Sequence, residues 1–224
     1  MSIKPVRVDA FYLATFGEPA FAFLKWPDLY EAIFRRFSPW VRPEDILWES
    51  QSTHPSALQV TCNLLEVQAV VKFRLMNVEV WNGSASLEVP GDSSLWSEII
   101  GRTTSLVGDL CAEDNLPFAS HAFSLNVHWQ SPTIFADELK KWTRDAPQDF
   151  RASGVAFVKE SQDAPRTTVD FQPSLLVPEA YNNGFARIKC EFPGSVSADA
   201  AYPQALLVIR DTLKRFDIDF ELTK

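Results

Sequence analysis

The hydrophobic pattern of the chain alternates with period two over several segments, which is typical of half-buried β-strands. Residues 58–64, 119–130 and 186–192 alternate most regularly. The segment 6–16 is apolar at successive positions in its middle, so we expect a strand that is centrally placed in the sheet or covered on both faces. The same reasoning predicts further strands over 46–49, 71–75, 153–160, 167–177 and 218–222.

Four other segments carry apolar residues at helical spacing. The first is opened by Trp26-Pro27-Asp28, since proline fits the first turn of a helix and an acidic residue favours the positive end of its dipole. Leu29, Ile33 and Phe37 form its apolar stripe. The remaining helices are predicted over 93–112, 132–144 and 203–216.

Asn82-Gly83 is the strongest turn signal, because both residues accept the positive φ of a type I′ turn. A two-residue loop there predicts a hairpin in which Val80 faces Ala85, with Trp81 and Glu79 on the opposite, polar face. The apolar positions change from odd to even after Leu75. A β-bulge or a break between two strands would explain the change, and the bulge is the preferred interpretation.

The order of elements that starts near residue 6 is repeated from about residue 119. Asp9-Ala10-Phe11-Tyr12-Leu13 also echoes His121-Ala122-Phe123-Ser124-Leu125. The sequence therefore predicts an α+β fold of antiparallel β meanders with helices packed on one face. Two similar β-α-β(n)-α-β halves, 1–118 and 119–224, are expected from an internal duplication, and one continuous domain is the alternative.

The composition is that of a globular protein, with 46% apolar and 22% charged residues. The chain has no apolar run long enough for a membrane helix, and its N-terminal residues lack the apolar core of a secretory signal. The three cysteines, Cys62, Cys111 and Cys190, are widely spaced. They are interpreted as buried free thiols, and a cytoplasmic location is predicted.

The net charge of −8 makes the chain acidic, and neither half is basic. Lysine and arginine occur in runs of no more than two, such as Arg35-Arg36. Binding to duplex phosphates is therefore disfavoured, and we expect no nucleic acid and no membrane as partner. An acidic surface favours a protein partner, either a second copy of the chain or a basic protein.

Catalytic and metal-binding motifs are absent from the sequence. Of the three histidines, His54 falls in a polar loop, whereas His121 and His128 lie on opposite faces of one strand. The latter two cannot bind one metal ion from a regular strand. The sequence thus predicts no catalytic residue, no metal and no cofactor.

An aromatic side chain on a polar strand face is typical of an interface or of a second covering layer. Trp81 with Glu79, and Trp40 and Trp48 in a loop-rich segment, are the candidate binding residues. The predicted function is a non-catalytic protein-interaction protein: an adaptor, an inhibitor or immunity-type protein, or an oligomeric scaffold. The alternatives are a small-molecule binding protein with an aromatic-lined pocket, and an enzyme with dispersed acid/base residues such as Glu79 or Asp170.

Overall fold

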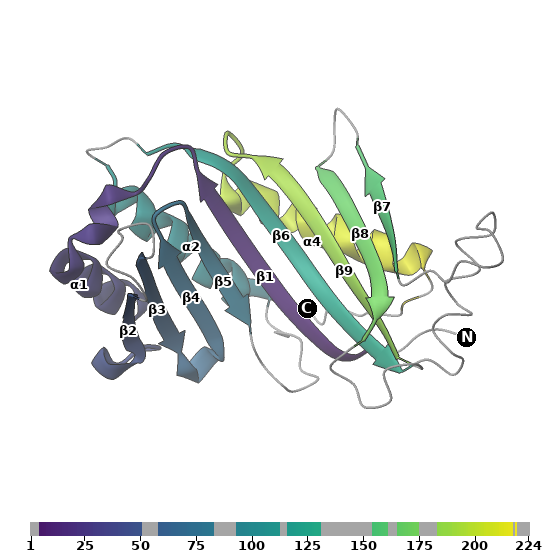
Figure 1. Ribbon diagram of the computed structural model, residues 1–224, viewed down its shortest axis with the longest axis horizontal. Helices are drawn as coiled ribbons and strands as arrows, with labels where there is room; N and C mark the ends of the chain where they lie inside the picture. The colour runs from purple at the N-terminus through teal and green to yellow at the C-terminus, as the bar shows by residue number, and fades with distance from the viewer. Residues whose placement is uncertain are drawn as a thin grey trace.

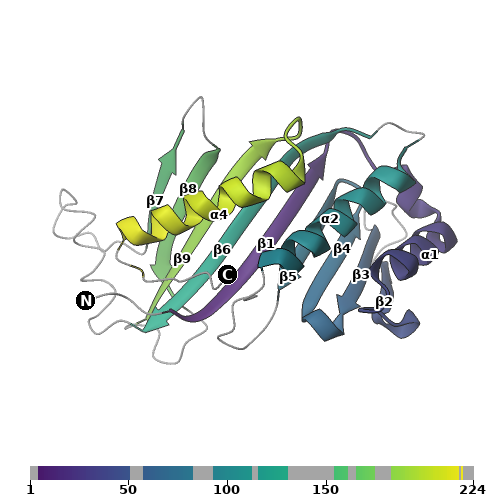
Figure 2. The ribbon, with the colours of Figure 1, turned by 180° about the vertical axis from the view of Figure 1, so that it is seen from behind.

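In the computed structural model, nine antiparallel strands form one sheet, and the helices lie on one of its faces (Figures 1 and 2). The structure describes residues 5–50, 58–82, 93–112, 116–130, 154–160, 165–174, 183–216 and 218. The strand order is β2-β3-β4-β5-β1-β6-β9-β8-β7. The elements are β1 (Pro5–Phe16), η1 (Phe21–Leu24), α1 (Trp26–Phe37), η2 (Pro43–Asp45), β2 (Ile46–Ser50), β3 (Leu58–Leu64), η4 (Leu65–Val67), β4 (Ala69–Arg74), β5 (Asn77–Asn82), α2 (Ser93–Leu110), β6 (Phe118–Gln130), β7 (Val155–Lys159), β8 (Arg166–Pro173), β9 (Asn183–Pro193) and α4 (Ala198–Arg215).

The core fills the space between the sheet and the helices. Period-two alternation places one apolar set of each strand on this side, such as Val8, Ala10, Tyr12, Ala14 and Phe16 of β1, all of which are buried. Each helix adds its own apolar stripe, and that of α1 is the predicted set Leu29, Ile33 and Phe37. Burying a side chain of this size stabilises the fold by roughly 1.5–3 kcal/mol.

The long strands β1 and β6 pair at the centre of the sheet, which confirms the predicted central position of the first strand. In their register Tyr12 lies opposite Phe123, and Ala14 lies opposite His121. The other edge of β1 pairs with β5. Both hydrogen-bonding edges of β1 are therefore used, and the two sides of the sheet are joined by continuous backbone pairing.

A tight turn, and not a bulge, separates β4 from β5. β4 ends at Arg74 and β5 begins at Asn77, so Leu75 and Met76 form the connection. The preferred bulge interpretation was wrong, and a break between two strands is correct. Val71 pairs with Val80 and Phe73 with Val78, because the two-residue turn moves the apolar set from odd to even positions while both strands face the helices.

The hairpin predicted at Asn82-Gly83 does not form the expected cross-strand pairs. Val80 lies between Val71 of β4 and Tyr12 of β1, so neither edge of β5 accepts a strand that contains Ala85. Residues 83–92 lie outside the described part of the chain. The turn signal reports only a local backbone preference, whereas the strand that pairs with β5 on this edge is the distant β1.

The α+β fold with helices on one face of an antiparallel sheet is confirmed, but the internal duplication is not. The strands follow in similar order outward from the centre, β5-β4-β3-β2 beside β1 and β9-β8-β7 beside β6. However, the sequence echo aligns Phe11 with Phe123, and these side chains lie on opposite faces, because Tyr12 and Phe123 share one. Strands from before and after residue 118 belong to one sheet. The division into 1–118 and 119–224 stays a prediction.

Helix α4 begins earlier than predicted. Ser197 caps it by accepting a hydrogen bond from the backbone N–H of Ala200 at 3.3 Å, and Pro203 lies inside the helix. The helix predicted over 132–144 lies outside the described residues, as does all but Ile218 of the predicted terminal strand. Among the described helices, none is long and apolar enough to cross a membrane.

Candidate functional site

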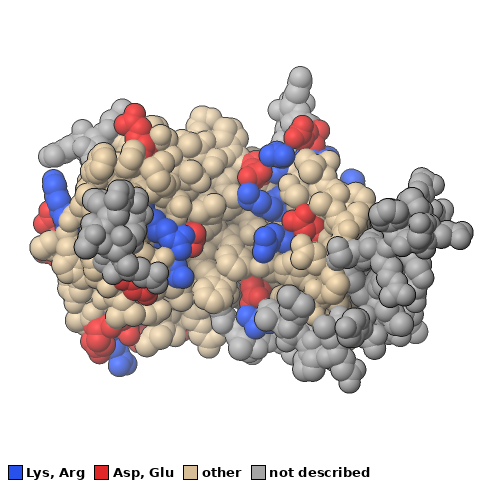
Figure 3. Space-filling model, viewed as in Figure 1, with Lys and Arg blue, Asp and Glu red and all other residues tan. Residues whose placement is uncertain are grey.

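The sheet face turned away from the helices, here called the open face, carries polar, charged and aromatic side chains (Figure 3). They alternate along each strand with the buried core residues, and most of them are half-buried. The open face is formed by Arg7, Asp9, Phe11, Leu13 and Thr15 of β1; Lys72 and Arg74 of β4; Asn77, Glu79 and Trp81 of β5; Ser120, Ala122, Ser124, Asn126 and His128 of β6; Arg166 and Asp170 of β8; and Phe185, Arg187, Lys189 and Glu191 of β9.

An aromatic pair occupies the middle of the open face. Phe11 and Trp81 are cross-strand partners whose ring centroids lie 6.0 Å apart, with 12° between the ring planes. Their neighbours in the same row are Val70 on one side and Ser124 on the other. The distance between the ring centroids lies within the range of a stacked pair. The nearly parallel rings therefore form an uncharged aromatic strip two strands wide.

One group of cations, the β4 group, lies beside this strip and consists of Lys72 and Arg74. The Nε of Arg74 donates to Oε1 of Gln59 at 3.0 Å, and its guanidinium forms an ion pair with Glu79. About a third of each charged side chain in this ion pair is exposed, 35% for Arg74 and 34% for Glu79. Solvent screens such a pair, so it stabilises the fold by no more than about 1 kcal/mol.

A second group, the β9 group, lies on the other side of the strip. It consists of Arg187 and Lys189 of β9 and Arg166 of the adjacent strand β8. The Nζ of Lys189 lies 2.6 Å from Oε1 of Glu191, and Nη1 of Arg166 lies 3.6 Å from Oε2 of the same carboxylate. Arg187 Nε donates to Oδ1 of Asn126 at 3.2 Å. Figure 3 shows blue atoms in two groups with an uncharged strip between them.

A buried polar network closes one end of the open face. The Nε of Arg7 lies 3.0 and 3.1 Å from the two carboxylate oxygens of Asp9. His128 Nδ1 lies 2.9 Å from Oγ of Ser174, and its Nε2 lies 3.8 Å from Oδ2 of Asp9. Burial lowers the pKa of His128, opposed by the Asp9 carboxylate, while the charge of Arg7 lowers it further.

This network contains serine, histidine and aspartate but lacks the geometry of a catalytic triad. The 3.8 Å between His128 and Asp9 is too long for a hydrogen bond, and Ser174 is fully buried. A substrate cannot reach a hydroxyl in that position. The partner of His128 is Ser174, which no spacing in the sequence connects with it.

The other buried histidine belongs to the core. His121 Nδ1 lies 2.9 Å from the hydroxyl of Tyr12 on the helix-covered face, and burial lowers the pKa of His121. His121 and His128 therefore lie on opposite faces, as the sequence predicted. The thiols of Cys62 and Cys190 are buried, which raises their pKa to about 12 and about 11, so both stay protonated at neutral pH.

Of the predicted binding residues, Trp81 and Glu79 lie together on the open face. Trp40 and Trp48 lie elsewhere. The ring of Trp40 packs under Arg102, with the guanidinium carbon 4.3 Å from the ring centroid, and Trp48 contacts Trp26 of α1 edge to face at 4.8 Å. Phe11 was missed because the middle of its strand is apolar on both faces, so the sequence pattern does not show which face is open.

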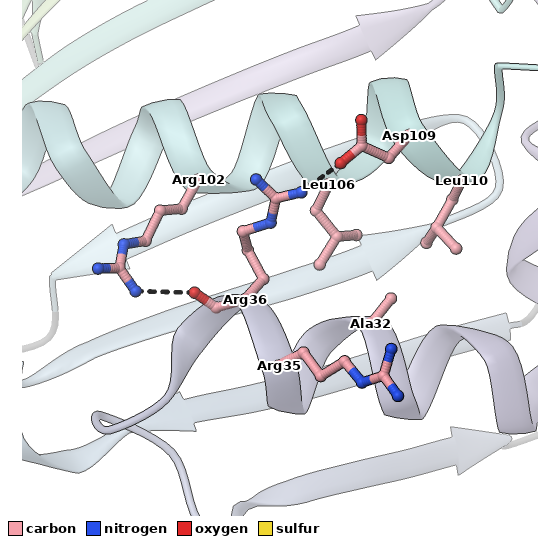
Figure 4. Close-up of a pocket in the computed structure, with 7 residues that line it drawn as sticks. All are labelled: Ala32, Arg35, Arg36, Arg102, Leu106, Asp109 and Leu110. Carbon is pink, nitrogen blue, oxygen red and sulfur yellow. Dashed lines mark hydrogen bonds and ion pairs between the residues drawn. The ribbon is translucent and has the colours of Figure 1, made fainter.

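A groove of about 490 Å³ runs between α1 and α2 (Figure 4). Two of its arginines, Arg36 and Arg102, join the two helices. Arg102 Nη1 donates to the carbonyl of Arg36 at 2.8 Å, and Arg36 in turn forms an ion pair with Asp109 and donates to Ser105 Oγ at 2.9 Å. These contacts are those of an interhelical clamp, and they leave the open face as the candidate site. Across the described ranges, no group of three or more His, Cys, Asp or Glu side chains is arranged to hold a metal ion.

No family model and no curated protein matches the chain. Among known structures, the chain is similar to the rolling circle replication initiator protein from Geobacillus stearothermophilus. The match has a TM-score of 0.39 and 13% identity, and it covers 93% of this chain and 80% of that chain. Likeness at this level assigns neither a fold family nor a function to the chain.

Two expectations are corrected here. The first is the predicted function, a non-catalytic protein-interaction protein, which conflicts with similarity to a replication initiator. The second is the predicted set of partners, a second copy of the chain or a basic protein and no nucleic acid, which conflicts with the same finding. None of these expectations is retained. Runs of charge in the sequence do not show where cations gather, because strand register brings Lys72, Arg187 and Lys189 onto one face from distant positions.

Proposed function

We propose that the chain binds single-stranded nucleic acid on the open face of its sheet. The observation that carries the proposal is the stacked pair of Phe11 and Trp81 on a face otherwise open to polar ligands, with cations on both sides. Aromatic side chains on a sheet surface are platforms on which unpaired bases stack, and nearby cations track the phosphates.

The layout of the face favours a strand that crosses the sheet. The row that contains Trp81 and Phe11 continues through Ser124 to Lys189. From β4 to β9 there are four strand spacings, about 19 Å at about 4.8 Å each. A bound strand can thus place bases on the aromatic pair while its phosphates reach the β4 and β9 groups, whose exposed ion pairs are weak enough to exchange partners.

A single strand fits this face better than a duplex. The bases of a duplex are stacked on each other, so their faces are closed to aromatic side chains. The net charge of −8 also opposes the dense phosphate charge of a duplex. The buried thiols of Cys62 and Cys190 support a cytoplasmic location for this activity.

The proposal is tested by fluorescence anisotropy with labelled 20-nucleotide single strands of mixed sequence. Phe11→Ala and Trp81→Ala should each weaken binding by about 1–3 kcal/mol, the value of one stacked base. Trp48→Ala removes an exposed aromatic from the helix-covered side and should leave the affinity unchanged.

The salt dependence gives a second measurement. Lys72→Gln and Arg187→Gln should each reduce the slope of log K against log salt by about 0.7, whereas Lys214→Gln on α4 should not. Absence of binding by the wild-type chain at about 50 µM protein and low salt would contradict the proposal, since even non-specific binding lies near that range.

A further inference from the structure

Two polar atoms on the open face are buried and lack a hydrogen-bond partner among the described residues. They are the indole Nε1 of Trp81 and the amide oxygen Oδ1 of Asn77. Both belong to open-face side chains of β5, one near each end of the strand. Native proteins satisfy nearly all buried polar groups, so two such atoms on one strand require an explanation.

The neighbours of each atom explain why it has no partner. Trp81 lies between Val70 of β4 and Phe11 of β1, and neither side chain carries an acceptor for the indole N–H. Asn77 lies between Arg74 and Thr15. The guanidinium of Arg74 is directed to Gln59 and Glu79, and the Thr15 hydroxyl makes no hydrogen bond to Asn77 Oδ1. The folded chain gains nothing from the indole N–H that a phenyl ring would not supply.

We infer that Trp81 donates a hydrogen bond from Nε1 to the bound nucleic acid, while Asn77 Oδ1 accepts one from a base amine. The inference rests on the proposed function and adds polar recognition to stacking on β5. The acceptor for Trp81 is a phosphate oxygen or a base carbonyl. A rotation that brings the indole edge to the ligand breaks no hydrogen bond, because the folded chain makes none there.

Trp81→Phe tests this role, since it keeps an aromatic ring for stacking and removes the N–H together with part of the indole ring. Its affinity for the single strand should fall about two- to tenfold, the usual net effect of one hydrogen bond. Its melting temperature should fall only slightly, because no hydrogen bond of the free protein is lost and a ring still packs against Phe11. Trp48→Phe is the matched control and should bind as the wild type does.

Two further strands identify the acceptor. If a phosphate accepts, the difference between wild type and Trp81→Phe should vanish on a methylphosphonate strand. If a base carbonyl accepts, the difference should vanish on an oligo(dA) strand, because adenine stacks but has no carbonyl group. Asn77→Ala is the second, independent variant, and it should also bind about two- to tenfold more weakly.

Equal affinity of Trp81→Phe and wild type, together with weaker binding by Trp81→Ala, would overturn the inference and leave the proposed function intact. Failure of the wild-type chain to bind any strand would instead overturn both. A Trp81→Phe protein that loses affinity and stability in the same proportion would also count against the inference, because the indole would then act in folding.

Discussion

At the scale of single residues, the histidines of β6 show how burial sets charge. His121 and His128 each keep one hydrogen-bonded partner inside the protein, Tyr12 and Ser174 respectively. Burial lowers the pKa of both rings, so each is neutral in the folded protein at pH 7. In the unfolded chain the same rings take up protons below about pH 6.5.

This difference predicts acid destabilisation. Below about pH 6.5 the unfolded state binds more protons than the folded state, so the free energy of unfolding should fall as the pH falls. Each histidine contributes up to about 1.4 kcal/mol per pH unit. Urea unfolding of wild type and His128→Gln between pH 7.5 and 5.5 checks this, and the variant should show a clearly smaller pH slope. An identical slope would mean that His128 titrates normally in the fold.

At the scale of elements, the helices are held to each other as well as to the sheet. Arg102 of α2 reaches the backbone carbonyls of Arg36 and Ser38 at the end of α1, at 2.8 and 3.3 Å, and covers the ring of Trp40. A guanidinium can satisfy several carbonyls at once, which suits it to the C-terminal end of a helix.

Removing this clamp should lower stability. Arg102→Ala loses hydrogen bonds to two carbonyls and a packed aromatic contact, so we expect a loss of about 1–2 kcal/mol after allowing for its partial exposure. Arg35→Ala is the control, because its helical pair with Glu31 is largely exposed and contributes little. Urea denaturation measures both, and equal stability of the two variants would exclude the clamp.

At the scale of the whole molecule, the pairing of β1 with β6 makes one sheet from the two predicted halves. A chain cut near residue 118 leaves β1 as a long edge strand with an open row of backbone hydrogen-bonding groups. It also exposes the side of Tyr12 and Phe16 that packs against β6 residues Phe123 and Phe118.

We therefore expect residues 1–118 alone to lack a cooperative unfolding transition, whereas the full chain unfolds in a single one. Thermal unfolding monitored by circular dichroism compares the two proteins. A fragment that melts cooperatively, at a temperature near that of the full chain, would instead establish 1–118 as an independent domain.

The sequence by itself determined the elements and the sidedness of the sheet, because periodicity and caps are local properties. The alternation in β3, β6 and β9 and the stripe of α1 predicted which side chains are buried, whereas the middle of β1 is apolar at successive positions. It could not determine which strand pairs with β5, since the Asn82-Gly83 turn signal carries no information about a partner some seventy residues earlier in the chain.

Only the tertiary structure assembled the candidate site. Register placed Phe11 beside Trp81 and grouped Lys72, Arg187 and Lys189 on one face, although they are far apart in the chain. Trp48 pairs with the buried Val60 and Trp40 follows α1, so both predicted residues lie away from Trp81 and Glu79. Backbone pairing between distant strands fixes these positions, and the free energy that selects one pairing comes from the whole core rather than from any segment.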